Sequence, residues 1–231
     1  MPEIRTITLA LPYGLGRVNC YLVKADEGYV LIDTGVSNQR AALEQELVNA
    51  GCQPGNLKLI VLTHGDFDHT GNAAYLRQKF SAPLALHPDD FGMIERGDMF
   101  ASRDSGNPIL KIMAPVLFKF GKSNRVTPEL RLSEEFDLSA YGFDARVISL
   151  PGHSRGSIGI LTSEGDLFVG DLLENTKQPA LNSIMDNRAA AQASVEKLKN
   201  LNVKLIYPGH GTPFAMDQFQ VNAAIASSSV A

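Results

Sequence analysis

A short segment of the chain, residues 63–71, places four candidate metal ligands within six residues. These ligands are two histidines and two aspartates: His64, Asp66, Asp68 and His69. Imidazole and carboxylate groups packed this tightly repel one another or lose hydration unless a cation joins them. The segment therefore predicts metal binding, with more than one ion.

Three further candidate ligands lie in the second half of the chain: His153, Asp171 and His210. Each follows an apolar segment, and a glycine directly precedes each one, which is typical of a strand that ends in a fixed turn. A single histidine in such a place is usually a structural residue. Four histidines and three aspartates in equivalent places favour one shared site.

The elements that must position these ligands are strands that end at a common edge. The apolar segment 57–62 predicts a buried strand before the first cluster, and residues 72–80 predict the helix after it. The carboxyl end of a strand is where open α/β sheets usually place their sites. Other expected strands cover 4–9, 19–24, 29–33, 84–86, 145–150, 157–162, 167–170 and 203–207. Expected helices cover 38–50, capped by Asn38, then 188–200, and a short tail from Phe214.

Residues 88–127 differ from the rest, because they are rich in methionine and phenylalanine. They predict one or two helices joined by a mobile loop, inserted between two similar halves of strands and helices. Composition and periodicity support an α/β or α+β fold with mixed sheets, and two such halves with outer helices would form a four-layer αββα sandwich.

Bulk properties narrow the classes of function. The chain has 231 residues, 44% of them hydrophobic, and a net charge of -4, so no basic surface invites nucleic acid. It has no apolar stretch of about 18 residues for a membrane span, and its N-terminus does not resemble a signal peptide. Cys20 and Cys52 lack metal-ligand spacing and are expected to be buried thiols in the cytoplasm. We expect a small-molecule substrate and a monomer or homodimer.

The motifs together resemble the metallo-β-lactamase superfamily, whose pattern is Thr-His-x-His-x-Asp-His followed by a distant His, Asp and His. The matching segments follow the family's order and span nearly the whole chain: 33–35, 63–69, 151–153, 170–171 and 208–211. The resemblance implies a single αββα domain over residues 1–231, with residues 88–127 as a lid or substrate wall.

The resemblance also implies a ligand set for two divalent ions, with zinc as the expected metal. The first ion would be bound by His64, Asp66 and His153, and the second by Asp68, His69 and His210. Asp171 and a hydroxide would bridge the two ions. Asp68 would also orient the nucleophile, and Asp33 would hold the metal-binding loop from behind the ligands.

Asp66 departs from the family pattern, which usually has histidine at this position. A carboxylate adds negative charge and a harder donor, which shifts preference from zinc toward iron or manganese. The alternative is that Asp66 does not coordinate and the first site is weak or empty. Flavodiiron proteins of the same superfamily also carry a carboxylate here, although this chain lacks the flavodoxin-like domain that supplies their electrons.

The sequence leaves several activities open. The first hypothesis is a dinuclear hydrolase acting on a small ester, thioester, lactone or amide through the bridging hydroxide. The others are a diiron or sulfur-oxidising oxidoreductase, a phosphoesterase or nuclease, and a non-catalytic metal-binding module. Three features weigh against particular hydrolases: no signal peptide for a periplasmic lactamase, no basic C-terminal helical segment as in a typical glyoxalase II, and no tyrosine after Asp171 as in quorum-quenching lactonases. Fold and metal site do not fix the substrate.

Overall fold

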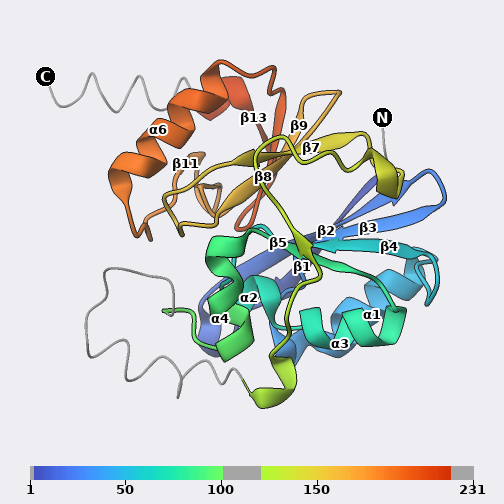
Figure 1. Ribbon diagram of the computed structural model, residues 1–231. Helices are drawn as coiled ribbons and strands as arrows, with labels where there is room; N and C mark the ends of the chain where they lie inside the picture. Colours follow the sequence, from blue (N-terminus) through green and yellow to red (C-terminus); the bar gives the residue numbers. More distant parts are fainter. Residues whose placement is uncertain (1–2, 101–120, 220–231) are drawn as a thin grey trace, which may run out of the picture.

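Two β-sheets lie face to face between two outer layers of helices (Figure 1). The computed structural model describes residues 3–100 and 121–219. Three helices cover the outer face of the first sheet: α1 (Arg40–Asn49), α3 (Ala73–Phe80) and α4 (Phe91–Arg96). Helix α6 (Arg188–Lys199) covers the outer face of the second (Figure 1). The four-layer arrangement predicted from the sequence is therefore confirmed.

The first sheet has six strands in chain order, and the ligand cluster follows the fourth. The strands are β1 Ile4–Ala10, β2 Arg17–Ala25, β3 Gly28–Ile32, β4 Leu57–Val61, β5 Leu84–Leu86 and β6 Leu130–Arg131. Strands β1 to β3 pair antiparallel, and β3 to β6 pair parallel. The helices of this half are α1 Arg40–Asn49, α2 Phe67–Thr70, α3 Ala73–Phe80 and α4 Phe91–Arg96.

The second sheet has five strands in the order β13-β12-β9-β8-β7. Its strands are β7 Ala145–Ser149, β8 Ile158–Thr162, β9 Asp166–Gly170, β12 Leu205–Pro208 and β13 Phe214–Ala215. Strand β8 runs antiparallel to both β7 and β9, while β12 runs parallel to β9. Strands β7, β9 and β12 therefore share one direction. Helix α6 spans Arg188–Lys199, and β10 Leu173–Glu174 pairs with β11 Ala180–Leu181 outside the main sheets.

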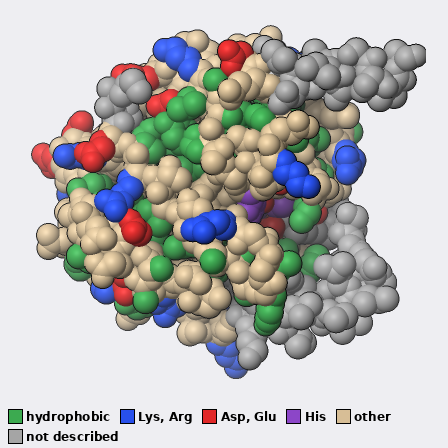
Figure 2. Space-filling view, turned by 180° about the vertical axis from the view of Figure 1, so that it is seen from behind, with side chains coloured by type: hydrophobic (Ala, Val, Ile, Leu, Met, Phe, Trp, Pro, Cys, Tyr) green, Lys and Arg blue, Asp and Glu red, His purple; other side chains and the backbone are tan. Residues whose placement is uncertain are grey.

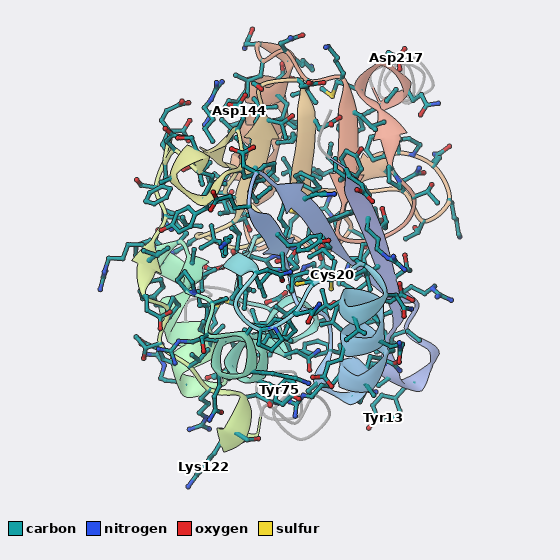
Figure 3. All side chains as sticks on the ribbon, turned by 90° about the vertical axis from the view of Figure 1, so that its right-hand side faces the viewer. Tyr13, Cys20, Tyr75, Lys122, Asp144 and Asp217 are labelled. Atoms are coloured by element: carbon teal, nitrogen blue, oxygen red, sulfur yellow. The ribbon has the colours of Figure 1, made fainter. Side chains whose placement is uncertain are left out.

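The apolar core has layers because side chains alternate along each strand. In β2, Cys20 and Leu22 pack toward the helices of the first half, whereas Tyr21 and Val23 pack between the two sheets. Figure 3 shows Cys20 in the interior of the molecule. Cys20 and Cys52 are both free and buried, as expected. In the described part of the chain, no helix combines the length and the apolar character that crossing a membrane requires.

Two local predictions need correction, and a third is tested only in part. Asn38 does not cap α1, because Ser37–Gln39 forms a separate 3-10 turn and Gln39 occupies the cap position. The predicted tail helix does not begin at Phe214, because Phe214 and Ala215 pair with β12. In the insert, α4 confirms one helix after residue 88, while the expected loop and any second helix fall on residues 101–120, outside the described residues.

Candidate metal centre

The predicted ligands come together where the two sheets meet. His64 and Asp66 lie in the turn after β4, and Asp68 and His69 lie in the short helix α2. The other three follow the carboxyl ends of β7, β9 and β12: His153, Asp171 and His210. Because these three strands run in the same direction, their ends open at one edge of the second sheet and face the turn after β4.

The seven side chains form three overlapping groups, each with ligand atoms within 4.8 Å of one another. The groups are His64, Asp66 and His153; Asp68, His69 and His210; and His64, His69 and Asp171. The first two groups have the same members as the two predicted ligand sets. The third joins Asp171 to one histidine from each set, which is the position required of a bridging residue.

Asp171 lies at the centre of this arrangement. Its Oδ1 is 3.3 Å from His69 Nε2, and its Oδ2 is 3.3 Å from His210 Nε2 and 3.9 Å from His153 Nε2. Asp66 Oδ2 lies 3.0 Å from His153 Nε2 and 3.8 Å from His64 Nε2. Asp66, which stands where the family usually has histidine, thus points its carboxylate into the centre.

All four histidine rings point Nε2 into the centre and use Nδ1 for a contact outside it. The Nδ1 partners are Thr63 Oγ1 for His64 at 3.0 Å, Asp33 Oδ2 for His69 at 2.8 Å, the Ile184 carbonyl for His153 at 2.8 Å and the Arg17 carbonyl for His210 at 2.7 Å. A carbonyl or carboxylate can only accept, so Nδ1 carries the proton in the last three rings. Thr63 donates its own hydroxyl to Asp33 at 2.8 Å, so its oxygen accepts from His64.

These tautomers make the site suited to cations. A neutral ring that donates through Nδ1 presents a lone pair at Nε2, and in His153 that lone pair faces a carboxylate oxygen of Asp66 at 3.0 Å. Three buried atoms of the cluster have no hydrogen-bond partner among the described residues: His64 Nε2, His69 Nε2 and Asp171 Oδ1. Converging acceptors without a donor require a proton or a metal ion between them. The residues therefore fit divalent metal ions.

Without metal, burial and the neighbouring charges of the cluster shift the pKa values of its side chains. Burial lowers the pKa of His64 well below its ordinary value, and its neighbours His69 and His153 lower it further. Burial also opposes the charged form of His210, but the Asp171 and Asp68 carboxylates raise its pKa to about 11. Burial would raise the pKa of Asp171, but His210 and His69 hold it well below its usual range. The centre thus attracts positive charge.

Asp33 holds the first-sheet ligands from behind. It is buried and accepts from the Thr63 amide at 2.8 Å as well as from the Thr63 hydroxyl and His69 Nδ1. Its backbone has a φ of 60°, in the left-handed region that a non-glycine residue occupies only at a cost. The turn after β3 is therefore strained in a way that aims Asp33 at the ligand loop.

The face opposite to that of Figure 1 exposes the centre. Figure 2 shows the histidine side chains at the bottom of a hollow, with basic and hydrophobic side chains near its rim. The β1–β2 turn carries Tyr13, whose side chain is 79% exposed and projects from the molecule (Figure 3). Part of the candidate ligand set is therefore visible from this face.

The family model described as the metallo-β-lactamase superfamily matches residues 13–210, which include every predicted ligand. The chain belongs to this superfamily. Its fold is that of a family of metal-dependent hydrolases that bind divalent metals, and its described residues include candidate His/Asp ligand groups.

Several relatives of the superfamily cover most of the chain. A probable metallo-hydrolase of Methanocaldococcus jannaschii is 27% identical, with 84% of this chain and 87% of the relative covered. The hydroxyacylglutathione hydrolase GloC of Haemophilus influenzae is also 27% identical, over 71% of this chain and 70% of its own.

A solved structure, TTHA1623 in a di-iron-bound form, is 28% identical with a TM-score of 0.69, covering 92% of this chain and 96% of that one. The Thermus thermophilus metallo-β-lactamase family protein TTHA1429 has a TM-score of 0.74 at 24% identity, with 97% of this chain and 79% of that chain covered, and shows the shared fold.

Sequence reasoning missed residues that hold this metallo-β-lactamase centre together. Asn19 donates to the carbonyls of Pro208 at 3.1 Å and Gly211 at 2.7 Å, and Tyr21 donates to Pro208 at 2.6 Å, so β2 fixes the turn that carries His210. An asparagine in the middle of an apolar strand was the available signal. Asp90, which accepts from the amide of Gly65 in the ligand loop at 2.9 Å, was also missed, because the residues after His87 have the sequence of an ordinary helix start.

Proposed function

We propose that this protein is a two-metal hydrolase that cleaves a small ester, thioester, lactone or amide. The observation that carries the proposal is the pair of ligand groups, one on each side of Asp171, with every Nε2 turned inward. Seven ligands from both sheets exceed what one ion needs.

Each proposed ion would have its own three ligands. His64, Asp66 and His153 would hold the first ion, and Asp68, His69 and His210 the second, with Asp171 shared. When bound, two divalent ions lower the pKa of water to near neutrality and polarise a carbonyl oxygen. The Asp68 carboxylate, which lies 3.5 Å from His210 Nε2 through Oδ2, would orient the attacking water and accept its proton.

Zinc is the first metal to test, because all four histidines would serve as nitrogen ligands, two for each ion. Asp66 gives the first ion a harder oxygen donor, which brings iron and manganese into the comparison. The relative named hydroxyacylglutathione hydrolase acts on a thioester by its name, which supports a thioester as the first substrate class to test here.

A second candidate is a diiron oxidoreductase on the same residues. Two observations favour it: the carboxylate at position 66, and a relative at 28% identity solved in a di-iron-bound form. It would use iron and an external reductant or thiol, and would consume oxygen.

The experiment is metal analysis of purified protein followed by a substrate panel. We expect two metal ions per chain, with hydrolysis of thioesters, esters or lactones that a chelator abolishes and added metal restores. We expect Asp66→Ala to lower occupancy toward one ion, and full two-metal occupancy in this variant would refute its ligand role. Iron as the only metal, with oxygen consumption and no hydrolysis, would favour the oxidoreductase.

A further inference from the structure

A buried aspartate outside the ligand set lies beneath the first metal group. Asp90 is 0% exposed and ends the 3-10 turn Pro88–Asp90 between β5 and α4. Burying a carboxylate in this way is costly unless hydrogen bonds compensate, and burial raises the pKa of Asp90. Its position therefore calls for donors.

Three donors meet the Asp90 carboxylate, and they come from two different loops. Oδ2 accepts from the Gly65 amide at 2.9 Å and from the Ser154 hydroxyl at 2.6 Å, and Oδ1 accepts from the Gly156 amide at 3.0 Å. Ser154 is itself braced by Ser157, whose hydroxyl lies 2.8 Å away and accepts from the Ser154 amide at 3.0 Å. One side chain thus ties the loop after β4 to the loop after β7.

Each of these loops carries ligands of the first group. Gly65 stands between His64 and Asp66, and Ser154 directly follows His153. The approach is close: a Cβ at Gly156 would meet Asp90 Oδ1 at 2.7 Å, and one at Gly65 would meet Met93 of α4 at 2.8 Å. A shift of Asp90 would therefore move both loops.

Only an acceptor-only group satisfies this arrangement. An ionised carboxylate has acceptor capacity for all three donors, whereas an asparagine would turn an NH₂ toward a backbone N–H or the Ser154 hydroxyl. Asp33 has a comparable role in the second group, because it accepts a hydrogen bond from the His69 ring itself. Asp90 instead accepts from backbone amides of the two loops that carry the first group.

We propose that Asp90 is a positioning residue that fixes the distance between His64, Asp66 and His153 and so sets the affinity of the first metal site. This inference rests on the proposed function, because it assumes that those three residues bind an ion. It adds a role for a residue outside the ligand set.

The test is a cobalt(II) titration of chelator-treated protein, followed by visible absorption. Wild-type protein should bind two ions. Asp66→Ala disables the first site and gives the spectrum of the second alone, whereas His210→Ala disables the second site and gives the spectrum of the first alone. In Asp90→Asn we expect the first-site step to weaken about 10- to 100-fold while the second-site step stays unchanged. The spectrum with one ion bound should match that of Asp66→Ala.

Two further variants keep the result interpretable. Asp166→Asn is the matched control. Asp166 is also buried, and burial raises its pKa, but it begins β9, at the end of the strand opposite to Asp171. In this variant both cobalt-binding steps should be unchanged. Ser154→Ala removes one of the three donors and should weaken the first-site step by a smaller factor. If circular dichroism shows that Asp90→Asn does not fold, the Ser154→Ala variant tests the role of Asp90 in its place.

The outcomes separate the two proposals. If wild-type protein fails to bind two ions, the proposed function fails. If wild-type protein binds two ions but the first-site step is unchanged in Asp90→Asn, or both steps weaken equally, the role of Asp90 is overturned and the proposed function stands.

Discussion

At the scale of single residues, the centre depends on which nitrogen each histidine turns inward. The rings of His153 and His210 are oriented by backbone carbonyls, which cannot be mutated away and can only accept. The rings of His64 and His69 are oriented through Thr63 and Asp33 instead. The four histidines follow the usual family pattern. Asp66 is the residue of the first ligand group that departs from it.

We expect Asp66→His to shift metal content toward zinc. Imidazole is a softer donor than carboxylate and removes one negative charge from the first site, so iron and manganese lose their advantage there. The measurement is metal content after expression in medium with equal zinc and iron, compared between wild-type and variant protein. Asp144→His, at an exposed position outside the centre (Figure 3), is the control and should leave the ratio unchanged. An unchanged ratio in Asp66→His would show that residue 66 does not select the metal.

At the scale of elements, side-chain hydrogen bonds join neighbouring helices and strands. Glu129 is an example at the end of β5 away from the centre: it accepts from Arg77 of α3 and from the Leu84 amide at 3.0 Å, where β5 begins. Partial burial would raise the pKa of Glu129, but these donors hold it below its ordinary value of 4.5. The carboxylate therefore stabilises the fold when ionised.

We expect Glu129→Gln to lower the free energy of unfolding at neutral pH by about 0.5 kcal/mol, because the pair is largely exposed and screened. A lowered native pKa contributes stability above the unfolded value of 4.5, which is lost as pH falls through the native pKa. The difference between variant and wild type should therefore vanish in acid. Urea unfolding of both proteins at neutral and at acid pH measures this difference, with Glu27→Gln in the exposed β2–β3 turn as a control. A difference that persists in acid would contradict the ionic origin.

At the scale of the whole molecule, stability and site geometry share one core, the layer between the two sheets. Phe168 of β9 is fully buried there, with its ring centroid 5.2 Å from Tyr21 and 4.9 Å from Tyr207. Tyr21 belongs to the first sheet and also donates to Pro208 beside His210. Packing between the sheets therefore determines how the two halves of the ligand set face each other.

We expect Phe168→Ala to destabilise the protein by about 3–5 kcal/mol, because it leaves a cavity between the sheets. Chemical denaturation of metal-free protein measures this loss without the contribution of bound ions. Val48→Ala on the exposed side of α1, where Val48 is 61% exposed, should change stability by about 0.5 kcal/mol or less. A loss of similar size in both variants would mean that the two sheets do not share a cooperative core.

Much of the fold was predictable because its signals are local. Strand β4 is an apolar segment interrupted only by Lys58, and glycines mark the turns before His153, Asp171 and His210. The two-residue strands β6, β10, β11 and β13 were missed, because two residues carry no periodicity and depend on their neighbours. The Asn38 cap was wrong for a related reason: the 3-10 turn before α1 takes up that residue.

By itself the sequence predicted the types and order of the candidate ligands, their places after strands, and the superfamily to which the chain belongs. Only the tertiary structure decided how the ligands are grouped, which nitrogen of each ring turns inward, and that Asp90 joins the two loops of the first group. The reason is distance along the chain. His210 is oriented by a carbonyl 193 residues away, and Asp90 meets its donors 25 to 66 residues away. No local pattern encodes such contacts, because they exist only once the two sheets have packed together.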